Sequence, residues 1–210
     1  GSPVNSRALQ IKAGSRLGLS ATPRRYGDPE GTKKLIDYFS GVVPPSISLE
    51  DAMRAGRLVP YRYFPHAISL TAEESDQWLD FSNRIRKEVA RSRTDAEGKK
   101  QLSERARMLL IQRSRIAKKA SAKVDLAVRI LNDEFQEGQS WLVYCEDSEQ
   151  LADVVSGLRM HGMESIEYHS NMLGDRDSTM EWFHKFGGIL VSIKCLDEGV
   201  DIPKVSHALI

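Results

Sequence analysis

The sequence has few cysteines, few aromatic residues and no long apolar run. It contains two cysteines in 210 residues, Cys145 and Cys195, and both lie on or beside apolar, strand-like segments. Two isolated cysteines provide no metal-ligand cluster, so we expect buried free thiols in a reducing compartment. No apolar run approaches the roughly 18–20 residues of a membrane span, and no signal peptide is visible. The sequence therefore predicts a cytoplasmic protein with no membrane partner.

The net charge of +1 hides a segregation of the two signs along the chain. Residues 84–123 contain 14 Lys/Arg against 4 Asp/Glu, a local charge of +10, whereas residues 133–210 contain 5 against 15, a local charge of −10. The basic segment is suited to a polyanion, which the acidic segment would repel. Aromatic residues are missing from Val89 to Lys123, so base stacking is not indicated. A solvated or partner-facing surface is the alternative interpretation of the basic segment.

The first two thirds of the chain show mainly helical spacing of apolar residues. Thr71 followed by Glu74 is a capping-box start for the longest of these helices. Apolar and polar residues alternate in two other places, which predicts strands. The predicted helices cover residues 32–39, 49–55, 71–92, 99–120 and 121–135, and the predicted strands cover residues 16–19 and 58–70.

From residue 141 onward, short apolar strands alternate with helices. This alternation predicts a parallel sheet with right-handed crossovers. Because the chain stops in the middle of the last predicted strand, we expect it to be a piece of a longer protein. The predicted strands cover residues 141–145, 165–169, 188–193 and 205–210, and the predicted helices cover residues 149–160 and 176–186.

Several segments in fixed order resemble motifs of superfamily 2 helicases and translocases. Leu19-Ser20-Ala21-Thr22-Pro23 resembles their motif III, and the Trp141–Glu146 segment resembles their motif IV strand. Cys195-Leu196-Asp197-Glu198-Gly199-Val200-Asp201-Ile202-Pro203 resembles motif V, in the form common among the DEAD/DEAH-box, type III restriction and XPB-like group. Tyr168-His169-Ser170, followed by Arg176, resembles the segment between motifs IV and V. The resemblance spans residues 16–210 in order.

The resemblance implies an α/β fold, with a RecA-like parallel sheet of the helicase C-terminal type preceded by a helical segment. Residues 1–58 would end a first RecA-like domain, and residues 59–210 would form an incomplete second one that includes a basic helical segment at about 72–135. The sequence contains no G-x-x-x-x-G-K-[ST] phosphate loop and no Asp-Glu metal motif, and motif VI should lie beyond Ile210. The resemblance implies that ATP and Mg²⁺ bind only in the intact protein, together with the rest of the same polypeptide.

The resemblance also implies roles for individual residues. Gly199 has no Cβ to block a ligand, and the Asp201 carboxylate is suited to accept hydrogen bonds from a ribose hydroxyl. Each role has a local alternative: a turn or helix cap satisfying its own backbone, a structural histidine, or a solvated loop. The implied roles are coupling for Ser20, Ala21 and Thr22, nucleotide binding for Glu198, Gly199 and Asp201, and nucleic-acid binding for Cys145, His169, Ser170, Arg176 and Ser192.

The sequence thus predicts a fragment of an ATP-dependent DNA helicase or translocase, contributing part of the ATP and nucleic-acid cleft and inactive alone. The form of motif V favours double-stranded DNA over RNA, through the resemblance. Two alternatives keep the fold: a non-catalytic nucleic-acid-binding module, and the motor subunit of a restriction or phage-defence complex. A third is an unrelated doubly wound domain with chance motif matches.

Overall fold

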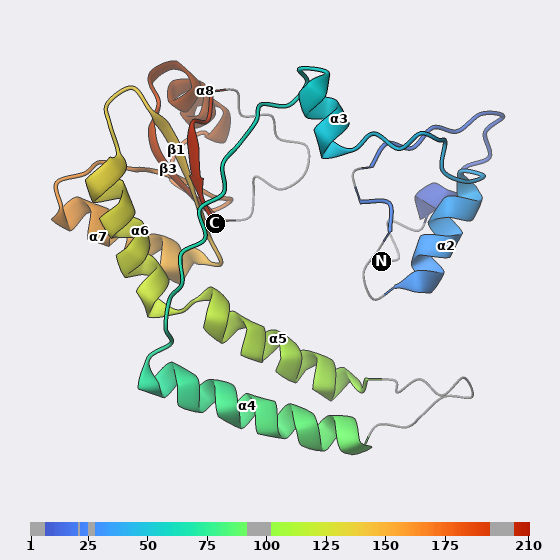
Figure 1. The fold of residues 1–210 in the computed structure, drawn as a ribbon, viewed down its shortest axis with the longest axis horizontal. Helices are drawn as coiled ribbons and strands as arrows, with labels where there is room; N and C mark the ends of the chain where they lie inside the picture. The colour runs from blue at the N-terminus through green and yellow to red at the C-terminus, as the bar shows by residue number, and fades with distance from the viewer. Residues whose placement is uncertain (1–6, 21, 25–27, 92–101, 194–203) are drawn as a thin grey trace. The chain divides into compact units, whose positions relative to one another are not determined.

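The computed structural model of the chain describes residues 7–20, 22–24, 28–91, 102–193 and 204–210 (Figure 1). The chain divides into two compact units, Gly1–Pro65 and His66–Ile210. Among the described residues, no helix is long and apolar enough to cross a membrane.

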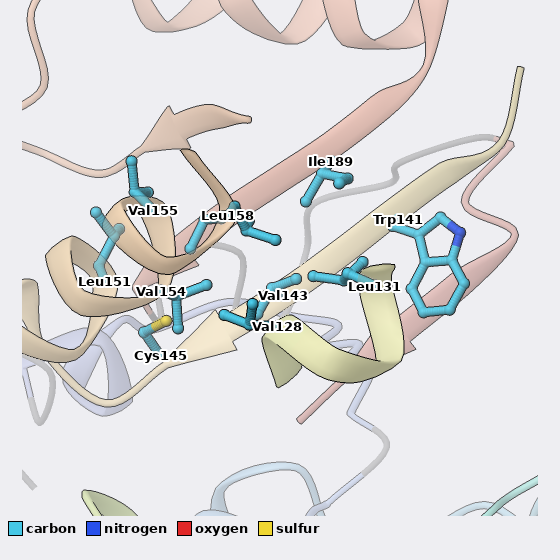
Figure 2. Close-up of a cluster of buried hydrophobic side chains, with 11 residues drawn as sticks. Val128, Leu131, Trp141, Val143, Cys145, Leu151, Val154, Val155, Leu158 and Ile189 are labelled. Carbon is cyan, nitrogen blue, oxygen red and sulfur yellow. The ribbon is translucent and has the colours of Figure 1, made fainter. Parts of the chain in front are cut away.

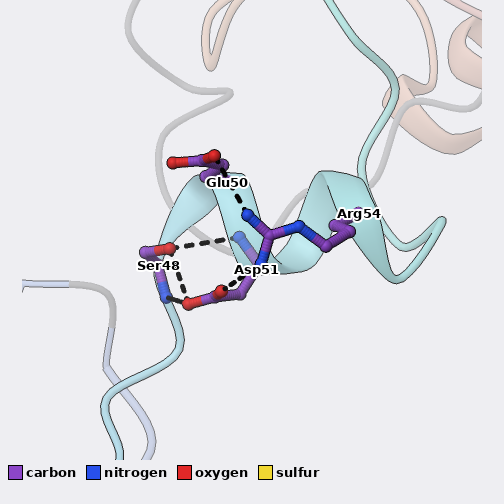
Figure 3. A network of polar contacts seen from close by, with 4 residues as sticks. All are labelled: Ser48, Glu50, Asp51 and Arg54. Atoms are coloured by element: carbon purple, nitrogen blue, oxygen red, sulfur yellow. Dashed lines mark hydrogen bonds and ion pairs between the residues drawn. The ribbon is translucent and has the colours of Figure 1, made fainter.

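The first unit contains short helices, which are η1 (Arg7–Gln10), α2 (Pro29–Tyr38) and α3 (Leu49–Arg54). Side chains cap the starts of α2 and α3. α3 begins with a reciprocal capping box, in which the Ser48 hydroxyl accepts from the Asp51 amide at 3.1 Å and the Asp51 carboxylate accepts from the Ser48 amide at 3.0 Å (Figure 3). The predicted helices at 32–39 and 49–55 are confirmed.

The two strands predicted near this unit, at 16–19 and 58–70, are wrong. Both segments are irregular and largely exposed, and the Leu19 side chain is 90% exposed. A strand needs a neighbour to pair its backbone groups, and the described residues of the first unit contain no strand. The first segment is instead held through side chains, since the Arg16 guanidinium lies 4.4 Å from the centre of the Tyr38 ring and donates to the Tyr38 carbonyl at 3.0 Å.

The second unit begins with two helices that lie side by side, α4 (Ala72–Arg91) and α5 (Glu104–Lys118) (Figure 1). The Thr71 hydroxyl accepts from the Glu74 amide at 3.1 Å, and the Glu74 carboxylate accepts from the Thr71 amide at 2.9 Å. This confirms the predicted capping box. The helix predicted at 121–135 is also confirmed, as α6 (Ser121–Glu134).

The rest of the second unit is a four-stranded sheet with helical crossovers. All described strand pairs are parallel, and the strand order is β2-β3-β1-β4. The predicted α/β class with a parallel sheet is therefore confirmed. The elements are β1 (Ser140–Cys145), α7 (Ser148–Met160), β2 (Ile166–Tyr168), α8 (Arg176–Phe186), β3 (Gly188–Ile193) and β4 (His207–Leu209).

Alternation along the central strands divides the core into two layers. One set of β1 and β3 side chains packs against α6 and α7, and Figure 2 shows this cluster. The opposite set packs against α8. The first layer contains Val128, Leu131, Trp141, Val143, Cys145, Leu151, Val154, Val155, Leu158, Ile189 and Val191, and the second is built around Leu142, Phe183 and Leu190.

Two glycines permit close backbone approaches in this core. A Cβ on Gly157 of α7 would lie 2.7 Å from the Val128 Cγ2 of α6, so the two helices approach more closely here than a residue with a Cβ would permit. Gly187 ends α8 with φ of 73°, and a Cβ there would meet the Gln139 carbonyl oxygen at 2.7 Å. The chain can therefore turn directly from α8 into β3.

Candidate nucleic-acid interface

The carboxyl ends of the parallel strands bring sequence-distant residues to one edge of the sheet. Cys145 at the end of β1 is in register with Ile193 at the end of β3, and Tyr168 at the end of β2 is in register with Ser192. The residues that follow β1 and β2, Glu146 and His169, therefore begin loops at the same edge. We call it the carboxyl edge. Open parallel sheets bind ligands at this edge.

The turn that follows β1 is closed by its own side chains. The Asp147 carboxylate caps α7 by accepting from the Gln150 amide at 3.1 Å. The Gln150 side chain is buried, accepts from the Glu146 amide at 2.8 Å and donates to the Lys118 carbonyl at 3.1 Å. Gln150 thus joins the end of α5 to the turn between β1 and α7.

Two lysines at the end of α5 neutralise the acidic residues of this turn. The Lys118 ammonium lies 3.2 Å from the Glu146 carboxylate, and the Lys119 ammonium contacts the carboxylates of Asp147, at 2.9 Å, and Glu149. The Glu149 and Asp147 carboxylates raise the pKa of Lys119. Burial opposes ionisation of Asp147, but hydrogen bonds from Lys119 and the Gln150 amide outweigh it, so the Asp147 pKa lies below its ordinary value.

The loop between β2 and α8 carries three of the predicted nucleic-acid-binding residues. His169 is mostly buried, its Nε2 lies 3.6 Å from the Glu167 carboxylate, and its Nδ1 accepts from the Asn171 amide at 3.3 Å. Ser170 and Arg176 are exposed, and Arg176 is the first residue of α8. The structure therefore places His169, Ser170 and Arg176 on one connection at the carboxyl edge.

A carboxylate of the chain itself, that of Asp175, caps the start of α8. The Asp175 carboxylate accepts from the Ser178 amide and from the Ser178 hydroxyl, both at 2.8 Å. The hydrogen bonds from Ser178 lower the pKa of Asp175. The Ser178 amide is thus occupied by Asp175, and the exposed groups near this helix start that suit a phosphate are the Ser170 hydroxyl and the Arg176 guanidinium.

The structure places two of the predicted nucleic-acid-binding residues, Cys145 and Ser192, in the interior of the domain, so a contact through either side chain stays a prediction. The Cys145 side chain is 3% exposed and lies in the core, where burial, and to a smaller extent the charge of Asp147, raises its pKa to about 12. Ser192 is fully buried within β3, between β1 and β2. Neither side chain is exposed to a ligand, because the strand alternation turns both of them into the interior of the domain.

Other predicted site residues fall partly outside the described structure. Ala21 of the coupling motif and the nucleotide-binding residues Glu198, Gly199 and Asp201 lie outside the described residues. The Ser20 hydroxyl accepts from the Thr22 amide at 3.1 Å, which is the local turn that we considered as the alternative to a coupling role. The coupling and nucleotide-binding assignments remain predictions.

The contacts of Gln150, Lys118 and Lys119 were not predicted from the sequence. The pattern Asp147-Ser148-Glu149-Gln150 contains a signal for the first of them, because a glutamine three residues after a cap commonly bonds back to the preceding turn. The lysines belong to a broadly basic segment, and sequence alone does not distinguish the two that meet the acidic turn from those that face solvent.

The comparisons with known proteins agree with this architecture. Residues 122–210 match the family model described as the helicase conserved C-terminal domain. These residues, somewhat under half of the chain, are similar to that family. The RecA-like fold and the resemblance to superfamily 2 helicases are thereby confirmed for the helicase C-terminal domain, which includes α6 and the whole four-stranded sheet.

The comparison with solved structures gives a distant similarity. One similar structure is the helicase domain of Hef from Pyrococcus furiosus, with 18% sequence identity and a TM-score of 0.37. The alignment covers 64% of this chain and 29% of the Hef chain, so the similarity spans less than a third of that protein. A comparison with curated proteins found no match.

Proposed function

We propose that this chain is part of an ATP-dependent DNA helicase or translocase of superfamily 2. In this role the helicase C-terminal domain contributes one side of a cleft that binds ATP and the nucleic-acid backbone, and it is inactive alone. The observation that carries the proposal is the match of residues 122–210 to the helicase C-terminal family, on a parallel sheet. Such sheets bind ligands at their carboxyl edge.

At the carboxyl edge, the residues suited to a phosphate backbone are Ser170 and Arg176. Their side chains are exposed and lie on one loop, and a hydroxyl and a guanidinium are typical phosphate ligands. His169, held by the Asn171 amide, would orient this loop. Because Asp175 occupies the adjacent amide, the phosphate contacts would come mainly from side chains. Double-stranded DNA is the substrate that the motif V resemblance favours.

ATP and Mg²⁺ would bind against the segment that contains Glu198, Gly199 and Asp201, which lies outside the described residues. ATP hydrolysis would supply the energy for closing and opening the cleft between two RecA-like domains. The chain contains no phosphate loop in its sequence, so the lysine that contacts the nucleotide phosphates would come from another part of the motor.

The test compares the 210-residue chain with the full-length protein from the same reading frame. We expect no ATP turnover above background from the chain, with or without duplex DNA. We expect DNA-stimulated ATP hydrolysis from the full-length protein, strongly reduced by Asp201→Ala. Asp153→Ala, which removes an exposed carboxylate of α7, is the matched control and should leave the rate unchanged.

Three results would contradict the proposal. ATP turnover by the 210-residue chain would show that it is not a partial site. Equal rates for Asp201→Ala and Asp153→Ala would remove the assigned nucleotide contact. A full-length protein that binds DNA but hydrolyses no ATP would favour the non-catalytic binding module.

A further inference from the structure

The α4–α5 pair has a tightly packed seam that uses some of its basic residues internally. Ile85, Ala106 and Leu109 are buried between the helices. The Arg113 guanidinium lies 4.9 Å from the centre of the Trp78 ring and donates to the Ser82 hydroxyl at 3.2 Å. These contacts bridge α4 and α5, so the pair presents its remaining side chains from a defined scaffold.

Many of the cations on the two helices are engaged with neighbouring acids. Arg84 pairs with Asp80, Arg91 and Arg105 both approach Glu88, and Lys118 and Lys119 contact the β1–α7 turn. In contrast, no ion pair among the described residues involves Arg107 or Arg115, and both side chains are exposed. The nitrogen–oxygen distances of these ion pairs are 2.9–3.7 Å.

Arg107 and Arg115 lie on one stripe of α5. They are eight residues apart with Ile111 between them, so all three follow i, i+4 spacing, and the two arginines are separated by about 12 Å along the helix. That length corresponds to roughly three to four phosphates of one strand along a duplex axis. The only acidic residue of α5 is Glu104, at its first position. We call Arg107 and Arg115 the α5 basic stripe.

The end of α5 is attached to the carboxyl edge. Gln150 donates to the Lys118 carbonyl, and Lys119 contacts Asp147 in the turn that follows β1. A duplex bound at the carboxyl edge would therefore lie next to the end of the helix that carries the α5 basic stripe. This continuity favours a nucleic-acid backbone over an unrelated acidic protein as the anion that the stripe meets.

We propose that the α5 basic stripe is a second contact surface for the phosphate backbone of a nucleic-acid duplex, adjacent to the carboxyl edge. The proposal rests on the proposed function for the location of the duplex. It adds a sequence-independent contact that lies outside the residues matched by the helicase C-terminal family. The positive charge of the stripe gives the α4–α5 pair an attraction for phosphates that the acidic residues 133–210 lack.

The test measures binding of a fluorescently labelled duplex DNA of random sequence to the 210-residue chain by anisotropy, over a range of salt concentrations. Arg107→Gln/Arg115→Gln removes two phosphate contacts, so the slope of log K against log salt should become shallower by about 1.8. Between 1 M and 0.1 M salt, this change in slope corresponds to a loss of affinity of about 60-fold relative to the unsubstituted chain. Arg129→Gln/Arg159→Gln, an equal charge loss at exposed positions of α6 and α7, is the matched control.

The outcomes separate this proposal from the proposed function. A loss confined to the stripe variant supports the stripe, and a similar loss in Arg176→Gln additionally supports the carboxyl edge. Loss in the stripe variant with an unaffected Arg176→Gln variant would support the stripe and contradict the edge site. Equal, small losses in the stripe and control variants would overturn the stripe, as would stronger binding of an acidic peptide than of duplex DNA. Parallel titrations with duplex RNA distinguish the two sources of backbone, and unchanged circular dichroism establishes that each variant is folded.

Discussion

The Gln150 side chain provides the sharpest test of how α5 is held at the carboxyl edge. It is 7% exposed, accepts from the Glu146 amide at 2.8 Å and donates to the Lys118 carbonyl at 3.1 Å. Gln150→Met keeps the length and volume of the side chain but removes both hydrogen bonds. Each bond contributes about 1 kcal/mol, and a buried group left without a partner costs about 1–3 kcal/mol.

We therefore expect Gln150→Met to lower the free energy of unfolding by about 2–4 kcal/mol in urea denaturation. Exchange of the Glu146 amide hydrogen should accelerate by at least about tenfold, because its acceptor is lost. Gln112→Met, at an exposed position of α5, is the control and should change stability by less than about 0.5 kcal/mol. Equal stabilities for the two variants, or unchanged exchange at Glu146, would refute the role assigned to Gln150.

Three further predictions concern the core and the charged turn. Gly157→Ala should destabilise the domain by about 1 kcal/mol, because the added methyl group overpacks on Val128. In a Val128→Ala background the same substitution should stabilise the domain by a similar amount, because alanine has the higher helix propensity. Additive effects in this double-mutant cycle would contradict the contact. The Cys145 thiol should resist alkylation at pH 8 until the chain unfolds, since burial raises its pKa to about 12. Rapid labelling of this residue in the native chain, measured by mass spectrometry, would contradict its position in the core. Because the pKa of Asp147 is lowered in the folded chain, its contribution to stability should be present above about pH 4 and be lost as the pH falls through the folded pKa. Lys119→Gln should make the free energy of unfolding, measured by urea titration, depend less on pH in this acid range. An identical pH dependence in the variant would argue against the ion pair.

The sheet domain was predictable because its sequence signals are local and agree with one another. The apolar runs at 141–145 and 188–193 are strands in the structure, and the helix predicted at 149–160 is α7, whose start Asp147 caps. The capping box of Thr71 and Glu74 likewise fixed the start of α4. In these places propensity, capping and hydrophobic period point to the same element, which is the condition for a reliable prediction.

The predictions that failed required information that a sequence pattern does not contain. The alternating segment 58–70 has strand propensity but pairs with no strand among the described residues, so its alternation produces exposed side chains instead of a sheet. The burial of the Cys145 and Ser192 side chains was likewise not predictable from the motifs, because tertiary packing determines which face of each strand is covered. The pairing of Lys119 with the acidic turn joins elements distant in the sequence, which the local pattern cannot reveal.

Hydrogen–deuterium exchange of the 210-residue chain with and without duplex DNA tests most directly whether the helicase C-terminal domain binds nucleic acid at its carboxyl edge. We expect slower exchange with DNA in residues 169–178, which form the loop before α8 and its first residues, and no change in α6, which packs on one face of the sheet. Unchanged exchange in residues 169–178 at DNA concentrations that saturate binding would show that DNA does not bind at the carboxyl edge.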